Sequence, residues 1–498
     1  MGPIRDQQGL EQGGVSSSDL YKIFSSEQLS AAHASELGVQ LGPLTVSGVG
    51  QADDTALLSN NIHQLYYLLQ LSINFGSKYH VQLSPGKSKL QVFQPKGSAM
   101  ETEYLKTVNP IAINNEQISF EDEAEHVGLV RSTNGNLPAI LARLEAYKSS
   151  LQSVLHTGMA RAHRGNPAAS LFIHQMYANP VLFSGLDSLV LSDHEKNMIN
   201  QHHKDTLSNL QKLIPLTPRP VVHFLAGVLL GTALLHLRQL SIFGMITRLP
   251  DTILHKHFVN ILEYRTVSPG SWLHQIGSLC QQYSLPHPTS LLATPLTKHS
   301  YKHLIKKKVI SYWELQLRAE ASALSSLKFF NPHYMSLSSP HPVWTSAGSS
   351  PTKVAMACVQ AKLLSGRYRT QALCSHWQNG DRKCRMSEEC SSDEDTSHIL
   401  QHCPALRTTR DKLNSFTAKY CNTHSIIANI VVKHCHTSSE LFCQFLLDCS
   451  ILPEVISLVQ EQGKVIHDHL FNITRVWCYS IHRDRLKILG RWRDFHKP

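Results

Sequence analysis

The spacing of apolar residues changes at Asn134-Gly135, and this change constrains the fold more than any other feature of the chain. Before it, β-prone runs such as 44–49 and 55–58 alternate with segments of helical spacing. After it, helical spacing continues almost without interruption, starting with a stripe at Ile140, Leu144, Tyr147, Leu151 and Val154. We therefore predict an α+β fold, in which a short antiparallel sheet and its helices precede a mostly α-helical remainder.

The composition is typical of a folded chain with several domains. A length of 498 residues allows about three domains, and 42% hydrophobic against 17% charged residues argues against global disorder. The formal net charge of +10 hints at a polyanionic partner. The longest apolar run, 221–237, contains His223 and His236 and predicts a buried helix rather than a bilayer span. No apolar signal segment follows Met1, so we expect an intracellular chain.

Two adjacent carboxylates, Asp53 and Asp54, lie between the first β-prone runs, so we place them at or beside the tip of a β-hairpin. Carboxylates on neighbouring strands can hold two Mg²⁺ ions, which stabilise the attacking and leaving oxygens in phosphoryl transfer. An Asp-Asp pair is also typical of a plain turn, because aspartate hydrogen-bonds to turn backbone. The surroundings of the pair decide between these interpretations.

Three further segments accompany the carboxylates in a fixed order. Gln12-Gly13-Gly14 precedes them, and a Pro-Gly turn with lysines at 83–89 follows, leading into a short strand at 90–93. A Gly-Leu pair within 126–129 comes last. Together with Ala52-Asp53-Asp54, these segments resemble in order and spacing the motifs of the reverse transcriptase of non-LTR retrotransposons.

This resemblance implies RNA-templated DNA synthesis, in which a primer 3′-oxygen attacks the α-phosphate of a deoxynucleotide and releases pyrophosphate. It makes Asp53 and Asp54 the Mg²⁺ ligands, with Asp54 the catalytic neighbour of Asp53. Lys87 would contact phosphate or protonate pyrophosphate; its alternative is an ordinary solvated loop lysine. Gln12, Gly13 and Gly14 would line the nucleotide pocket, where a glycine lets the backbone approach the nucleotide closely.

The chain also departs from the family pattern. The family carries a third carboxylate on a strand well upstream of its Gln-Gly motif, and here only eleven residues precede Gln12. Gln51 stands where an aromatic residue is common, Glu11 where arginine is common, and Ser18 where proline is common. Loss of a bridging metal ligand removes several kcal/mol of transition-state stabilisation, as an order of magnitude. We therefore expect a truncated polymerase, inactive alone and dependent on a chain that supplies the missing palm and fingers.

The resemblance divides the chain into five consecutive parts. They are a partial palm at 1–131, a helical thumb or connection at 132–262, a helical connector with Pro/Ser/His-rich linkers at 263–353, a zinc-binding segment at 354–410 and a helical basic tail at 411–498. Cations of the second part would hold the template–primer duplex through its phosphates, or would form the solvated side of amphipathic helices. They are Arg143, Lys148, Arg161, Arg164 and Lys204.

A second cluster of metal-ligand residues has the spacing Cys384-x5-Cys390-x7-His398-x4-Cys403. Three thiolates and one imidazole can close a tetrahedral structural Zn²⁺ site. Cys374 or His402 could replace one ligand, and reduced core cysteines are the alternative to a metal site. Non-LTR elements often carry a segment of this kind after the polymerase, ending in H-x4-C-P, which the stretch 398–404 resembles. We expect the acidic run Asp393-Glu394-Asp395 to stay on a solvated loop.

The C-terminal stretch Arg483–Arg493 mixes cations with Trp492 and suits two roles equally. It fits phosphate contact with base stacking on single strands, or an amphipathic helix with one solvated face. Taken together, the sequence predicts a retrotransposon-derived reverse transcriptase fragment whose partners are an RNA template, a DNA primer and deoxynucleotides. The alternative is a non-catalytic nucleic-acid-binding protein. Mg²⁺ and Zn²⁺ are the expected cofactors, and the family suggests residence in the nucleus.

Overall fold

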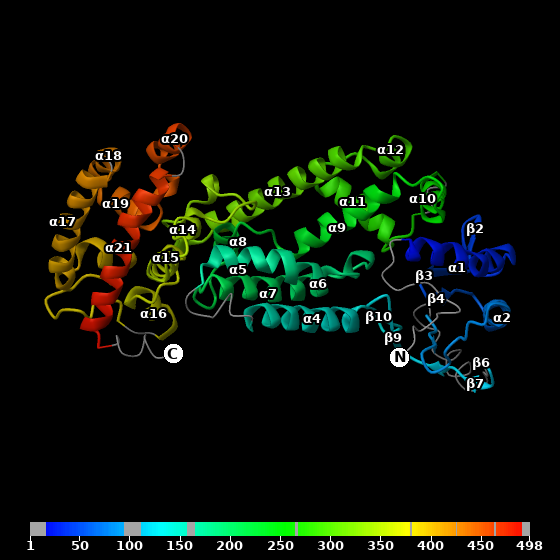
Figure 1. The fold of residues 1–498 in the computed structure, drawn as a ribbon. Helices are drawn as coiled ribbons and strands as arrows, with labels where there is room; N and C mark the ends of the chain where they lie inside the picture. The colour runs from blue at the N-terminus through cyan, green and yellow to red at the C-terminus, as the bar shows by residue number, and fades with distance from the viewer. Residues whose placement is uncertain are drawn as a thin grey trace, which may run out of the picture. The chain divides into compact units, whose positions relative to one another are not determined.

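The computed structural model describes residues 16–93, 111–156, 165–263, 267–378, 381–424, 426–462 and 465–490 (Figure 1). The chain forms two compact units that interleave along the sequence. Unit 1 comprises residues up to Arg143, Ser184–Ser192 and Arg238–His303, and unit 2 comprises the rest. The division into five consecutive parts stays a prediction. The described residues are mostly helical and include a few short strand pairs. They therefore belong to the α+β class that the sequence predicted.

Unit 1 contains all the strands that the structure describes, together with the helices that flank them. Its elements are α1 (Ser17–Ala34), β1 (Val39–Leu41), β2 (Leu44–Val46), β3 (Gly48–Gln51), β4 (Asp54–Leu57), α2 (Ile62–Tyr79), β5 (Lys89–Leu90), β6 (Ala112–Ile113), β7 (Glu116–Gln117), β8 (Ser119–Phe120), β9 (Glu123–His126), β10 (Leu129–Ser132), η2 (Leu186–Ser188), α10 (Ile253–Glu263), α11 (Trp272–Gln282) and α12 (Pro288–Ala293). Three helices begin in one unit and end in the other, namely α4 (Leu137–His156), α9 (Gly231–Ile246) and α13 (Lys298–Ser322).

The strands of unit 1 do not join into one sheet. Within the described residues they form separate two-stranded pairs, of which only β5 with β8 is parallel. The β-prone run 44–49 is divided at Ser47, whose buried hydroxyl donates to the carbonyl of Leu37 at 2.6 Å. As a result β2 pairs back with β1, whereas β3 pairs forward with β4. The prediction of a short antiparallel sheet therefore holds only for individual hairpins.

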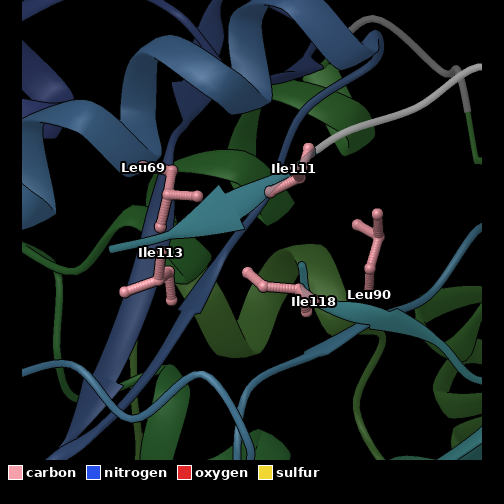
Figure 2. Packing of buried hydrophobic residues seen from close by; sticks show 5 residues of the cluster. All are labelled: Leu69, Leu90, Ile111, Ile113 and Ile118. Atoms are coloured by element: carbon pink, nitrogen blue, oxygen red, sulfur yellow. The ribbon is translucent and has the colours of Figure 1, made fainter. Parts of the chain in front are cut away.

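The core of unit 1 joins α2 to the short strands. Leu69 of α2 is buried with Leu90, Ile111, Ile113 and Ile118, and Figure 2 shows these five side chains gathered around the strands. Burial of each such side chain stabilises the fold by about 1.5–3 kcal/mol. Asn61 begins α2 by accepting the Gln64 backbone N–H at 2.9 Å, a common side-chain cap for a helix start.

Unit 2 is helical throughout the residues that the structure describes. Its further elements are α5 (Pro167–Ile173), the π-helix η1 (His174–Ala178), α6 (Asn179–Phe183), α7 (Asp193–Leu210), α8 (Arg219–Ala226), η3 (Ser325–Leu327), η4 (Pro332–Tyr334), α14 (Pro342–Thr345), α15 (Pro351–Leu364), α16 (Gln371–Gln378), the π-helix η5 (His398–His402), η6 (Pro404–Leu406), α17 (Arg407–His424), α18 (Ile426–Cys435), α19 (Ser439–Leu447), η7 (Cys449–Ile451), α20 (Pro453–Gln462) and α21 (Val465–Ile488).

Long-range polar contacts hold the C-terminal helices of unit 2 together. Gln360 of α15 is fully buried and donates to the carbonyl of Leu446 at 2.8 Å and to the hydroxyl of Thr474 at 3.0 Å. The segment 331–352, which its composition predicted to be a linker, contributes the fully buried Trp344. The indole of Trp344 donates to Gln211 at 3.2 Å, so this segment is part of the packed unit.

A buried histidine cluster, consisting of His174, His203 and His223, lies inside unit 2. The ring centroids of His174 and His203 are 5.5 Å apart, and those of His203 and His223 are 6.1 Å apart. The hydroxyl of Tyr147 lies 2.6 Å from His174 Nε2, and His223 Nδ1 lies 2.9 Å from the carbonyl of Val228. Within the described ranges, neither ring nitrogen of His203 has a hydrogen-bond partner.

The apolar run 221–237 forms a buried break between two helices. α8 ends at Ala226 and is followed by the C-cap Gly227, which adopts a φ of +64°, and α9 begins at Gly231. In the described part of the chain, no single helix has the length and apolarity needed to cross a membrane. By those two criteria alone, the pair α8 and α9 passes when taken together, with a bend of 58° between the helices. Most side chains in this run are buried inside the protein, as the sequence predicted.

Candidate metal centre

Four side chains converge in the C-terminal part of unit 2, namely Cys384, Cys390, His398 and Cys403. All are buried, and their ligand atoms lie within 4.8 Å of one another. The Sγ atoms of Cys384 and Cys403 are 3.7 Å apart, and Cys390 Sγ lies 3.4 Å from His398 Nε2. The thiols are free, and a disulfide would need a sulfur separation of about 2.05 Å. The prediction from the sequence that these four residues could hold a metal ion is confirmed.

Two of the separations between the ligand atoms match the edges of a tetrahedral zinc site. Zinc–sulfur bonds of about 2.3 Å and a zinc–nitrogen bond of about 2.0 Å place two sulfurs roughly 3.8 Å apart and a sulfur and a nitrogen roughly 3.5 Å apart. The distances between Cys384 and Cys403 and between Cys390 and His398 agree with both values. The four ligands could therefore hold a metal ion with little rearrangement.

Two short segments and one π-turn position the ligands. Lys383 and Asp393 form an antiparallel bridge, and the backbone N–H of Cys384 donates to the carbonyl of Ser392 at 3.0 Å. The π-helix η5 begins at His398, and the N–H of Cys403 donates to the carbonyl of His398 at 2.8 Å. This bond between residues five apart defines a π-turn. The x4 spacing therefore brings His398 and Cys403 to one site, and Pro404 then starts a new turn.

When no cation is bound, burial favours the neutral forms of Cys384, Cys403 and His398. It raises the pKa of the Cys384 thiol to about 12 and also raises that of Cys403. Burial lowers the pKa of His398. A metal ion reverses this preference for the thiols, because a coordinating thiol loses its proton.

The two substitute ligands that the sequence allowed lie outside the cluster. Cys374 is half-buried on α16 and is not among the converging residues. His402 Nε2 lies 2.9 Å from the hydroxyl of Ser439, and His402 is not among the converging residues. The group that could hold a metal ion therefore consists of Cys384, Cys390, His398 and Cys403.

The acidic run between the ligands is not wholly solvated, and for Glu394 the prediction is wrong. Glu394 is 0% exposed, and its Oε1 accepts a hydrogen bond from Arg485 Nε at 2.7 Å. Its Oε2 accepts from the backbone N–H of Gln371 at 2.9 Å, and Arg485 also donates to the carbonyl of Arg369. Asp393 remains on the surface and pairs with Arg382 at 2.9 Å. The buried pair ties the metal-ligand loop to α21.

The role of Arg485 is not evident from its sequence neighbourhood, because Arg485 lies in a run of cations that resembles a basic tail. Helical spacing offered a signal, since Cys478, Ile481, His482 and Arg485 share one buried face of α21. The neighbouring cations are also paired, because Asp484 contacts Arg483 at 2.9 Å and Lys487 at 3.8 Å. The described part of the tail is thus a packed helix with internal ion pairs. Its remaining residues, including Trp492, lie outside the described ranges.

Asp53 and Asp54 lie at the hairpin that the sequence predicted. β3 and β4 pair through Gln51 and Asp54, with Ala52 and Asp53 in the turn between them, and Ala52 adopts a φ of +51°. Both carboxylates are exposed. Asp53 also lies near Tyr21 of α1. The pKa of Tyr21 is raised, first by burial and then by the negative charge of Asp53.

The other polymerase-like residues are only partly brought together. Lys87 is exposed in the turn 84–88, whose N–H groups donate to the carbonyl of Ser84. Among the described residues, neither Asp53 nor Asp54 forms an ion pair with Lys87, and neither belongs to a converging group of three metal-ligand side chains. Gln12, Gly13 and Gly14 lie outside the described residues, as do Arg161 and Arg164.

The segment 126–129, which contains the Gly-Leu pair, forms a hairpin. β9 and β10 pair through His126 and Leu129, with Val127 and Gly128 in the turn at φ values of +51° and +70°. The guanidinium of Arg143 lies beside this turn, since a Cβ added at Gly128 would stand 3.5 Å from its Nη2. In the helical part, Lys148 is exposed and Lys204 is half-buried.

A Ser–His–Asp group elsewhere in unit 2 is structural. His341 Nε2 lies 3.2 Å from Asp448 Oδ2 and 3.3 Å from the hydroxyl of Ser450, so both partners meet the same ring nitrogen. The Nδ1 atom accepts the backbone N–H of Val343 at 3.2 Å, which caps α14. A hydrolytic triad needs serine and aspartate on opposite ring nitrogens.

No family model matches the sequence, and no curated protein is significantly similar to it.

Proposed function

We propose that Cys384, Cys390, His398 and Cys403 bind a structural Zn²⁺ ion in a nucleic-acid-binding protein that derives from a non-LTR retrotransposon reverse transcriptase. The observation that carries the zinc assignment is the match of the two ligand separations to the edges of a zinc tetrahedron. The hairpin turns at Ala52-Asp53 and Val127-Gly128 support the descent, because each motif has the local backbone that the resemblance requires.

Zinc is the metal that best fits this donor set. Three thiolates and one imidazole favour a soft or borderline cation and disfavour Mg²⁺ or Ca²⁺, which prefer oxygen ligands. Four protein ligands leave no open position for substrate, so the site is structural rather than catalytic. Its role is to fix the loop between Cys384 and Cys403 against α21, where Glu394 meets Arg485.

Metal content tests the zinc assignment directly. The reduced full-length chain, purified without added metal, should contain about one zinc ion per chain by elemental analysis. Cobalt substitution should give the intense thiolate charge-transfer absorption of a tetrahedral site. C384S and H398N should lose bound zinc and become sensitive to proteolysis around residues 384–403. C374S is the matched control, because Cys374 lies outside the cluster and should leave zinc content unchanged.

Two results would contradict the zinc site. One is a reduced, folded chain that binds neither Zn²⁺ nor Co²⁺. The other is a C374S variant that loses as much metal as C384S. Nucleic-acid binding is measured separately, by titrating a labelled RNA and a labelled RNA–DNA hybrid with the zinc-loaded chain. Absence of binding to both would refute the wider function but not the metal site.

Reverse transcription is the second candidate, and the Asp53-Asp54 hairpin is the observation that favours it. Under this proposal the two carboxylates bind Mg²⁺, and the RNA template, DNA primer and deoxynucleotides are the substrates. A primer-extension assay with Mg²⁺ on an RNA template, comparing the chain with its D53A/D54A variant, decides between the candidates. Extension that the variant loses supports catalysis. Unchanged nucleic-acid binding by the variant, with no extension by either chain, supports the non-catalytic protein.

A further inference from the structure

One face of α13 carries a run of cations that the functions above do not use. Lysines and histidines occupy two adjacent rows at four-residue spacing, Lys298, Lys302 and Lys306 in one row and His299, His303 and Lys307 in the other. We call these six residues the basic face of α13. All six side chains are exposed, and the whole run lies on one continuous helix.

The lysines of the basic face are not neutralised by carboxylates of the described ranges. None of its lysines forms an ion pair with the residues that the structure describes, and the first carboxylate along the helix, Glu314, pairs with Arg318. Like charges four residues apart destabilise a helix slightly. The helix is nevertheless held firmly, because Tyr301, Ile305 and Val309 on its other side are all buried.

We propose that the basic face of α13 binds the phosphate backbone of a nucleic acid. This proposal rests on the proposed nucleic-acid-binding function and assigns a surface to it. From Lys298 to Lys307 the helix rises about 14 Å. A nucleic acid strand presents one phosphate per 3.4 Å or so of axis, so about four phosphates can face the run. Lys298, Lys302 and Lys306 form one row of cations with a rise of about 6 Å between neighbours, and Lys307 adds a fourth cation from the adjacent row.

The surroundings of the basic face favour a nucleic acid over a membrane. A helix that lies on a lipid surface inserts its apolar side between the headgroups. The apolar side of α13 is already packed within the protein, as Ile305 and Val309 show. Lysines act on phosphates as point charges, which position a nucleic acid without reading its bases. We therefore expect binding that depends on salt and little on sequence.

The test compares two variants that remove the same number of positive charges. K298Q/K302Q/K306Q/K307Q neutralises the basic face, and glutamine keeps the helix propensity of lysine. The matched control is K22Q/K78Q/K89Q/K328Q, whose lysines are exposed on other elements and each contact a carboxylate. Affinity of the zinc-loaded full chain for a labelled single-stranded RNA and a labelled DNA duplex is measured by fluorescence anisotropy between about 50 and 200 mM salt.

The basic-face variant should bind both nucleic acids about a thousandfold more weakly at roughly 0.1 M salt, and its salt dependence should fall by about three ion equivalents. The control variant should keep most of the affinity for both nucleic acids and most of the salt dependence. If the wild-type chain binds and the basic-face variant binds as tightly, the proposal is wrong although the nucleic-acid function stands. If the wild-type chain binds neither nucleic acid, the proposed function fails and this surface assignment fails with it. If the same variant instead loses only binding to phosphatidylserine-containing vesicles, the surface is a lipid site and the proposal is overturned.

Discussion

Acidification should destabilise unit 2 because the buried histidine cluster must stay neutral. Burial lowers the pKa of His174 and His223 to about 4 each. Burial, and then the charges of the neighbouring histidines, lowers the pKa of His203 well below its usual value. In the unfolded chain histidine titrates near 6.5. The unfolded state therefore binds more protons below that pH, and stability is lost as the pH falls from about 6.5 towards 4.

The size of the effect follows from the two pKa values. At about pH 5, a histidine with a folded pKa of about 4 and an unfolded pKa of about 6.5 costs roughly 2 kcal/mol of unfolding free energy. His174 and His223 together would cost about 4 kcal/mol as an upper limit, against a total of about 5–15 kcal/mol for a typical domain, and His203 adds to this loss. Their charged neighbours, Arg219 and Lys204, disfavour the proton on His223 further.

Urea unfolding followed by far-UV circular dichroism from about pH 7.5 to about pH 5 measures this loss. His203→Leu removes the ring whose two nitrogens have no partner, so it should be tolerated at neutral pH. It should also reduce the acid-induced loss of stability, because one buried ring that must stay neutral is gone. His194→Gln is the matched control, because His194 is exposed on the same helix α7. Equal pH dependence in the wild type and His203→Leu would refute the reasoning.

Two further predictions concern the packing of unit 2. Glu394→Gln leaves the buried Arg485 without its charge partner and should lower the free energy of unfolding in urea by about 3–5 kcal/mol. Asp19→Asn breaks an exposed pair with Lys22, whose two side chains are 73% and 75% exposed, and should change the free energy of unfolding little. Equal effects of the two variants would contradict the role of the buried pair. Gly227→Ala should destabilise the fold strongly, because Gly227 has a φ of +64° and an added Cβ would stand 2.0 Å from the carbonyl oxygen of Ser339. The control is Gly277→Ala in α11, where an added Cβ meets nothing within 4 Å, and this variant should be neutral or stabilising. Thermal unfolding separates the two glycine variants, and a harmless Gly227→Ala would show that the turn after α8 is not strained.

Local features of this protein could be predicted from the sequence because they depend on neighbouring residues alone. The change to helical spacing after Asn134-Gly135, the hairpin turn at Ala52-Asp53 and the turn at Val127-Gly128 follow from apolar periodicity and turn preferences. The ligand spacing around Cys384 and Cys403 belongs to the same class, because a π-turn and one short bridge span it. A few backbone torsions decide each of these features.

The tertiary structure alone decided which polar groups are buried. The sequence near Glu394 does not indicate that Glu394 pairs with Arg485, which lies 91 positions away, or that both charged groups are buried. The burial of His203 and the packing of Trp344 inside a proline- and serine-rich segment depend in the same way on distant helices. Desolvation is a property of the whole neighbourhood of a side chain, and that neighbourhood is assembled from segments that are far apart in the chain.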